Sequence, residues 1–270
     1  MSIRNVRIDI EYDGRNYFGW QLQPQRPTIE GTVREAIESI VNHPITLLSS
    51  GRTDAGVHAE QHVGQFQTEV KIPCHNLMRA INSRLPNDIA VYRVIDMPHS
   101  WKARYSASAR NYRYAFLLSD APSALWGPRA MWYAQPLDLQ AMSRAAAYLV
   151  GTHNFEAFRS KKCTADNPER TIVEVSLESQ PPLLFLQVKG YAFLRHQVRI
   201  MAGTLLEVGQ GKRQPEEIQD LLQSGVRESA GDTLPAHGLT LVSVRYPQDE
   251  ELGIAPHRFP QPQGARIAPQ

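Results

Sequence analysis

Alternating apolar and charged residues mark the first stretch of the chain as a β-strand. Val6, Ile8 and Ile10 alternate with Arg7 and Asp9, and successive side chains of a strand point to opposite faces. The pattern therefore predicts a strand over residues 6–12 with one buried face. The Asp13-Gly14 pair that follows is typical of a turn, so we expect the strand to end there.

Apolar residues spaced three or four apart predict helices further along. The first predicted helix covers residues 29–41, with Thr32 and Glu35 placed as a capping box inside it. A second carries Leu77, Ile81 and Leu85 and is stopped by the turn residues 86–88. Three more helices follow in the second half of the chain, over residues 139–149, 194–208 and 218–223.

Further β-type segments lie between these helices, at residues 45–49, 63–66, 89–96, 112–116, 171–178, 184–189 and 239–246. Strands and helices mix without strict βαβ alternation, which favours an α+β fold with mostly antiparallel sheets. The second half repeats the order of the first, so we expect two similar subdomains, 1–99 and 100–247, with an active-site cleft between them. Four prolines are spaced along residues 248–270, and we expect this tail to be poorly ordered.

Composition narrows the class of protein only slightly. The 270 residues include 29 basic and 27 acidic side chains, a net charge of +2, so any claim of nucleic-acid binding must rest on local clusters. Cys74 and Cys163 lack metal-ligand spacing and indicate free thiols in a reducing compartment. The first residues carry charges where a signal peptide needs an apolar run, and no stretch approaches a membrane span. We expect a cytoplasmic protein.

The stretch GRTDAGVHAEQH, residues 51–62, concentrates reactive side chains. A phosphate-binding loop is excluded, because Val57-His58 stands where that motif needs a lysine. A metal site on His58 and His62 is disfavoured, because the residues after them alternate as in a strand, which would hold the two rings about 13 Å apart. The third hypothesis is a reactive carboxylate, Asp54, in a glycine-bounded loop beside Arg52. Its alternative is an aspartate that only caps a turn.

At these residues the sequence resembles the tRNA pseudouridine synthase A family. The resemblance rests on the segment Gly51–His58 and extends, in order, over about residues 3–247. Its further motifs are EYDG at 11–14, YFGWQ at 17–21, NSRLPNDI at 82–89, ARYSA at 103–107, RNYRY at 110–114, AFL at 192–194, His196 with Val198-Arg199, and PAHGL at 235–239. Tyr191, Gln197, Ile200, His62 and Thr240 depart from the residues usual in the family.

The resemblance implies the pseudouridine synthase fold and an isomerase that converts uridine to pseudouridine at positions 38, 39 and 40 of the tRNA anticodon stem-loop. It implies that Asp54 is the nucleophile, attacking either the ribose C1′ or the uracil ring. The rearrangement needs neither a redox step nor phosphate energy, so no cofactor or metal is expected.

Three further residues take roles from the resemblance. Arg199, beside the apolar stripe of its helix, is expected to pair with Asp54 and keep it ionised. Tyr112 is expected to stack on the uracil and to help remove the C5 proton, whereas Tyr114 on the same strand face is assigned to the core. Arg52 is expected to hold the flipped state of the target base. For Arg199 and Arg52, the alternatives are an ordinary surface arginine and a loop salt bridge.

Two clusters that interleave basic with aromatic or polar residues are candidates for tRNA contact. By resemblance, the contacts come from Trp101, Lys102, Ala103, Arg104 and Tyr105, and from Lys162, Cys163, Thr164, Ala165 and Asp166. The family also implies a homodimer and recognition of RNA shape. Three rival functions stay open at this point: a tRNA-binding protein or chaperone without catalysis, a pseudouridine synthase for another RNA position, and a metal-dependent hydrolase.

Overall fold

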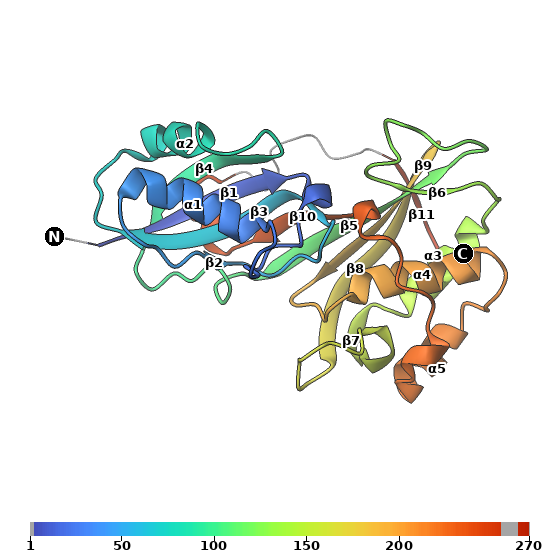
Figure 1. Cartoon of the computed structure of the whole chain (residues 1–270). Coiled ribbons are helices and arrows are strands. Elements are labelled where there is room, and N and C mark those ends of the chain that lie inside the picture. Colours follow the sequence, from blue (N-terminus) through green and yellow to red (C-terminus); the bar gives the residue numbers. More distant parts are fainter. Residues whose placement is uncertain (1–2, 255–263, 270) are drawn as a thin grey trace. The chain divides into compact units, whose positions relative to one another are not determined.

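The computed structural model describes residues 3–254 and 264–269, which form two compact units (Figure 1). Unit 1 contains residues up to 108 together with the segment from 241, and unit 2 contains residues 109–240 together with the last described stretch. The division therefore falls after Ser108, where the sequence placed it at residue 99. Residues 98–101 stay with unit 1 because the Asn5 side-chain amide donates to the carbonyls of Pro98 and Trp101.

Unit 1 is an antiparallel sheet in the order β10-β3-β1-β4, with β2 added beside β3. The strands are β1 (Arg4–Tyr12), β2 (Leu48–Ser49), β3 (His58–Thr68), β4 (Ile89–Met97) and β10 (Leu239–Arg245). The helices are the 3₁₀ turn η1 (Gly14–Asn16), α1 (Ile29–Val41), α2 (Cys74–Asn82) and α6 (Gln248–Glu251). α1 and α2 lie together over one face of this sheet (Figure 1).

The expectation that β1 buries a single face is wrong. Val6, Ile8 and Ile10 are fully buried, and so are Arg7 and Asp9 on the opposite face. That face is covered by the residues that precede and follow the second unit in sequence: Arg7 lies 4.7 Å from the Tyr246 ring centroid and 5.8 Å from that of Trp101. The charges are tolerated because they pair with each other, Arg7 Nε donating to Asp9 Oδ1 at 2.7 Å.

The helix caps also differ from the expected ones. α1 begins after Thr28, whose hydroxyl accepts a hydrogen bond from Gly31 N, so Thr32 and Glu35 form no capping box. Thr28 is the better cap because its backbone is extended, whereas Thr32 is already inside the helix. α2 ends at Asn82, short of Leu85, since the Asn82 side chain instead makes two hydrogen bonds to the backbone of Val91 on β4.

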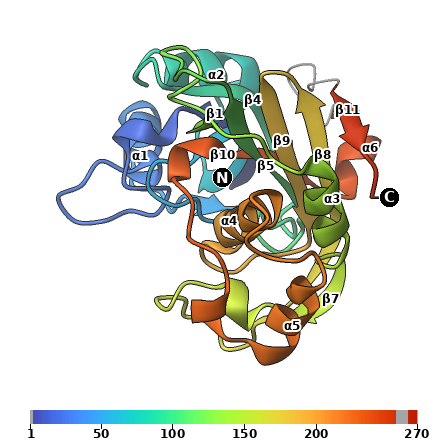
Figure 2. The ribbon, with the colours of Figure 1, turned by 90° about the vertical axis from the view of Figure 1, so that its right-hand side faces the viewer.

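Unit 2 is a second, mostly antiparallel sheet in the order β11-β8-β9-β5, with β6 parallel to β5 and β7 beside β8. Its strands are β5 (Ala109–Leu118), β6 (Met131–Tyr133), β7 (Gly151–Asn154), β8 (Glu169–Gln180), β9 (Leu183–Gly190) and β11 (Ala265–Ile267). Its helices are α3 (Leu139–Ala147), α4 (Gln197–Gly209) and α5 (Glu217–Ser224), with 3₁₀ turns at Glu156–Phe158, Arg227–Ser229 and Ala236–Gly238. Figure 2 shows α3 beside α4, and both contact the sheet.

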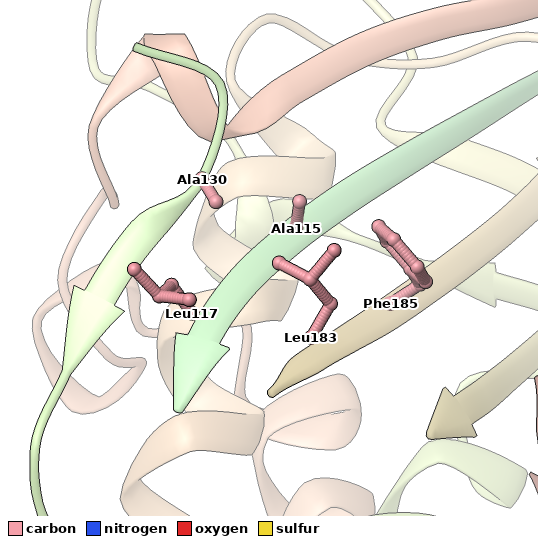
Figure 3. Packing of buried hydrophobic residues seen from close by; sticks show 5 residues of the cluster. All are labelled: Ala115, Leu117, Ala130, Leu183 and Phe185. Atoms are coloured by element: carbon pink, nitrogen blue, oxygen red, sulfur yellow. The ribbon is translucent and has the colours of Figure 1, made fainter. Parts of the chain in front are cut away.

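Both faces of β5 are covered. On one face Ala115 and Leu117 pack with Ala130, Leu183 and Phe185 (Figure 3). On the other face Tyr114 and Phe116 are fully buried, with ring centroids 5.0 Å apart. β5 is therefore covered on both faces over residues 114–117, and the half-buried Tyr112 lies just before this buried part of the strand. An α+β architecture with mostly antiparallel sheets is confirmed.

The expectation of a poorly ordered tail is wrong for the part that the structure describes. Residues 248–251 form α6, and Asp249 is buried against Arg7. Residues 265–267 form β11 along β8, and the carbonyl of Ile267 accepts a hydrogen bond from Ser143 on α3. Residues 255–263 and 270 lie outside the described part. Within the described ranges, no helix is long and apolar enough to cross a membrane.

Candidate active site

Asp54 lies in unit 1, on the loop between β2 and β3. The loop turns through Gly56, whose φ of +81° favours glycine, and Val57 N donates to the carbonyl of Asp54 at 3.2 Å. Asp54 is half-buried, Arg52 is exposed and Thr53 between them is buried. The loop thus anchors Thr53 in the core and leaves its two charged neighbours accessible.

The segment 17–20 holds this loop in place through the backbone. Gly56 N donates to the carbonyl of Tyr17 at 3.3 Å, and Trp20 N donates to the carbonyl of Thr53 at 3.1 Å. Gly19 between them has φ +84°, and a Cβ there would lie 2.6 Å from the Thr53 oxygen. A glycine is required because only hydrogen fits in this gap. The YFGWQ motif therefore clamps the Asp54 loop.

A layer of buried side chains supports the loop from below. The Tyr12 hydroxyl lies 2.8 Å from Thr53 Oγ1 and 2.9 Å from His62 Nδ1. The His62 ring stacks on Trp20, with centroids 3.8 Å apart and planes 14° apart. The supporting role of these residues was not predicted from the sequence.

The two histidines of the motif occupy one strand, β3, as the alternation predicted. His58 is buried, its Nδ1 3.2 Å from Asp13 Oδ1 and 3.3 Å from the backbone nitrogen of Gly14. Burial raises the pKa of Asp13, but hydrogen bonds from Arg15 outweigh burial and lower that pKa below its usual value, with a smaller contribution from His58. Each histidine therefore has a structural role beside the loop. Among the described residues, no group of three or more potential metal ligands is found.

Tyr112 and Arg199 lie in unit 2, so their expected partnership with Asp54 stays a prediction. Tyr112 is half-buried on β5 and packs edge-on against Phe193, with ring centroids 5.0 Å apart. Arg199 is half-buried on α4, and its Nε donates to the carbonyl of Leu234 at 2.7 Å. Tyr114 is fully buried and donates to the carbonyl of Pro235 at 2.9 Å, which confirms its assignment to the core. Burial raises the pKa of the Tyr114 hydroxyl above its usual range.

The first expected tRNA-binding cluster, in unit 1, divides into buried and exposed residues. Trp101 and Ala103 are buried, Trp101 against the ring of Tyr246 at 5.2 Å. Lys102, Arg104 and Tyr105 are exposed. The Arg104 guanidinium lies 5.7 Å from the Tyr105 ring centroid, so a cation and an aromatic ring are presented together to solvent.

The second expected cluster, residues 162–166 of unit 2, is a surface loop. Lys162, Thr164 and Asp166 are exposed, while Cys163 and Ala165 are half-buried. Arginines hold the loop through its backbone: Arg159 Nη1 donates to the Ala165 carbonyl at 2.7 Å, and Arg195 Nη1 donates to that of Lys162 at 3.4 Å. Burial lowers the pKa of nearby Arg170, and the charge of Arg159 lowers it further. Two basic side chains around the loop are paired with carboxylates, Arg159 with Glu156 and Lys161 with Glu228.

Comparison with known proteins identifies the family. The family described as tRNA pseudouridine synthase matches residues 9–106 and 145–247. This chain belongs to the tRNA pseudouridine synthase family.

Individual relatives agree with this assignment. The chain is 42% identical over 244 residues to the tRNA pseudouridine synthase A of Acetivibrio thermocellus, covering 90% of this chain and 100% of that protein. It is 44% identical over 246 residues to the protein of the same name from Syntrophotalea carbinolica, covering 90% and 97%. A solved Cbf5-Nop10-Gar1 complex matches with 13% identity and a TM-score of 0.31, covering 74% of this chain and 54% of that one, a likeness too weak to support an inference.

Proposed function

We propose that this protein converts uridine to pseudouridine in tRNA, at positions 38, 39 and 40 of the anticodon stem-loop. One observation carries the proposal: in a member of this family, Asp54 stands half-buried in a loop that the segment 17–20 clamps through its backbone. A carboxylate held rigidly at a solvent-accessible position is suited to attack a substrate rather than to fill a core.

The reaction breaks the bond from uracil N1 to ribose C1′ and forms a bond from C5 to C1′. The C5 proton is lost and N1 becomes protonated, so atoms balance without a co-reactant. Asp54 supplies the nucleophile by one of two routes. Attack at C1′ forms an Asp54–C1′ bond as the N1–C1′ bond breaks, and C5 then displaces the carboxylate. Attack at the ring forms an Asp54–ring bond that breaks again when the carboxylate leaves after the rearrangement, so both routes return a free Asp54. We assign the ionisation of Asp54 to Arg199, ring stacking and C5 deprotonation to Tyr112, and the flipped state of the base to Arg52.

The tRNA contacts are proposed at the two clusters described above. Lys102, Arg104 and Tyr105 supply exposed charge and an aromatic ring, and residues 162–166 form a surface loop whose backbone is held by Arg159 and Arg195. We further propose that the protein works in the cytoplasm as a homodimer. The dimer is supported by large apolar side chains that stand exposed in unit 2, namely Leu125, Trp126 and Trp132.

Tritium release from tRNA that carries 5-tritiated uridine tests the proposal. We expect release by the parent protein and none by Asp54→Asn, with tRNA binding retained in both, because this substitution keeps the shape and removes the charge. No release by either protein, despite tight binding, favours a tRNA-binding protein or chaperone. Equal release by both means that Asp54 is not the nucleophile.

The target position is tested separately by mapping pseudouridine in the product. Carbodiimide labelling followed by primer extension reports each modified nucleotide. Stops at positions 38, 39 and 40 support the proposal. Stops elsewhere keep the enzyme class and assign the protein to another site on RNA.

A further inference from the structure

Phe18 and Arg26 form an exposed aromatic–cation pair in unit 1. The Arg26 guanidinium carbon lies 4.5 Å from the centroid of the Phe18 ring, well within the range of a cation–π contact. The Phe18 ring is 42% exposed, and Arg26 is exposed as well. The pair therefore presents an aromatic ring and a guanidinium together to solvent, two groups on which a planar ligand can stack.

The segment that carries the pair is an exposed loop that hydrogen bonds close at its base. Residues 21–27 are all exposed, yet Phe18 N donates to the carbonyl of Pro27 at 2.9 Å and the Gln23 side chain donates to that of Phe18 at 2.8 Å. Glu30 closes the other side, its carboxylate accepting from Leu22 N at 3.0 Å. The loop backbone is therefore closed around Phe18 and Arg26, whose side chains contact each other.

This pair stands next to the loop of the proposed nucleophile. The residues on either side of Phe18 are in contact with that loop: the Tyr17 carbonyl accepts from Gly56 N, and Gly19 packs on the backbone of Thr53 and Asp54. Because both neighbours contact the loop, the backbone of Phe18 is held next to the backbone of the Asp54 loop. The segment that carries the pair therefore adjoins the loop of the proposed nucleophile in unit 1.

We propose that Phe18 and Arg26 are a stacking site for an unpaired base of the substrate RNA, next to the uridine that reacts with Asp54. Aromatic rings and guanidinium planes are the surfaces on which proteins stack unpaired RNA bases. Arg26 is the only charged residue in 21–27, so its charge is not offset within the loop. A hollow of about 590 Å³, lined by residues 22–28 and by Gly31, Thr32 and Glu35, opens beside it. The inference rests on the proposed function, since it assigns a contact of the same site.

The test separates stacking from simple charge attraction. Arg26→Lys keeps the charge and removes the planar guanidinium, and Phe18→Leu keeps an apolar side chain and removes the ring. Binding of an anticodon stem-loop RNA is titrated in the Asp54→Asn background, where turnover does not interfere. We expect each substitution to raise Kd by about five- to a hundredfold, as for the loss of one base stack. Phe18→Trp is expected to bind like the parent.

The salt dependence of Kd and a control variant complete the experiment. For Arg26→Lys we expect the slope of log Kd against log salt to stay as in the parent, because the number of neutralised phosphates is unchanged. Arg79→Lys, at another exposed arginine of unit 1, is expected to leave Kd unchanged. Circular dichroism and thermal unfolding confirm that each variant is folded.

Three results overturn the inference. If Arg26→Lys and Phe18→Leu bind like the parent while the unsubstituted enzyme releases tritium, the stacking site is wrong and the proposed function stands. Arg26→Ala is added to identify a phosphate contact: if it weakens binding while Arg26→Lys and Phe18→Leu bind like the parent, Arg26 contacts a phosphate and no base stacks there. Absence of both RNA binding and tritium release in the unsubstituted protein overturns the proposed function, and the inference with it.

Discussion

The hydroxyl of Tyr12 lies 2.8 Å from the hydroxyl of Thr53, the residue next to the proposed nucleophile. Tyr12 also reaches His62 Nδ1 at 2.9 Å, so a single hydroxyl joins β1, β3 and the Asp54 loop. Both side chains are buried, and a buried hydrogen bond fixes geometry as well as energy. The position of Asp54 thus depends on a tyrosine that has no direct part in the proposed reaction.

Tyr12→Phe is expected to lower kcat strongly and the free energy of unfolding only moderately. The substitution removes the hydrogen bonds to Thr53 and His62 with little change in packed volume, at a cost of about 1–3 kcal/mol in the free energy of unfolding. Urea denaturation measures that cost and tritium release measures kcat. Tyr133→Phe, which removes a hydroxyl 3.5 Å from Gln135 in unit 2, serves as the control and should change neither. An unchanged kcat in Tyr12→Phe would show that Thr53 does not need this contact.

Gly19→Ala is expected to disrupt the Asp54 loop. The added Cβ raises the energy of the folded state in two ways. Alanine is strained at a positive φ, and its Cβ would lie 2.6 Å from the Thr53 oxygen. Gly211→Ala isolates the first effect, because Gly211 has φ +71° and a Cβ there meets no atom within 4 Å. We expect about 1 kcal/mol of destabilisation for Gly211→Ala. Gly19→Ala should lose more stability and, unlike Gly211→Ala, most of its activity. Equal losses in both would mean that the loop accommodates the methyl group.

Asp249→Ala is expected to destabilise unit 1 strongly. Burial by itself lowers the pKa of Arg7, but the carboxylates of Asp9 and Asp249 outweigh burial and raise it, so Arg7 stays charged in the core. Removing one partner of a buried ion pair costs about 3–5 kcal/mol, and we expect the lower end because Asp9 remains. The control is Asp96→Ala, which breaks the exposed pair with Arg4 and should cost less than about 1 kcal/mol. Similar losses in the two variants, measured by urea denaturation, would contradict a special role for Asp249.

Asp13 is expected to make stability depend on pH in the acid range. Its pKa is lowered from the ordinary value of 3.8, so its ionised form stabilises the folded state above that value, and the contribution disappears as the pH falls towards the lower folded-state pKa. The parent should therefore be more stable than Asp13→Asn at pH 7, by less than about 1 kcal/mol because Arg15 is half-exposed. The difference should shrink below pH 4. A difference that grows on acidification would contradict the assignment.

Lys102→Gln and Arg104→Gln are expected to weaken the binding of tRNA by the same factor whatever the sequence of the tRNA. Both side chains are exposed, and removing one phosphate contact should lower the salt slope of log Kd by about 0.7 to 0.9. Trp101→Phe, at a buried neighbour, should leave the slope unchanged. Measurement of Kd at four or more salt concentrations checks both statements.

The spacing of apolar residues was enough to predict most of the helices and strands, but not which residues pack over them. α1 and β1 were found where their apolar residues recur, because that spacing follows from backbone geometry alone. The burial of Arg7 and Asp9 could not be read in the same way, since it depends on Trp101 and Tyr246, which lie more than ninety residues later in the sequence. A charged strand face looks solvent-exposed until its cover is known.

In the candidate site, too, local sequence motifs could be recognised, whereas contacts between distant segments could not. Asp54 was identifiable from its glycine-bounded motif, a local signal. The clamp by residues 17–20 was not identifiable, because it consists of backbone contacts. Only one of its side-chain identities matters, the glycine at position 19. Trp101 and Ala103 were expected at the RNA surface because the family resemblance covers the whole segment 101–105, and it does not distinguish the side chains of this segment that are buried, as these two are.

The ion pair between Arg7 and Asp249 joins the first strand of the chain to its last helix in unit 1. During synthesis on a ribosome, β1 emerges more than two hundred residues before its partner. Until then β3 lacks its neighbour β10, and the charges of β1 lack part of their cover. Unit 2, by contrast, has nearly all its strands in one continuous stretch. The nascent chain can therefore complete most of the second unit before the first one closes.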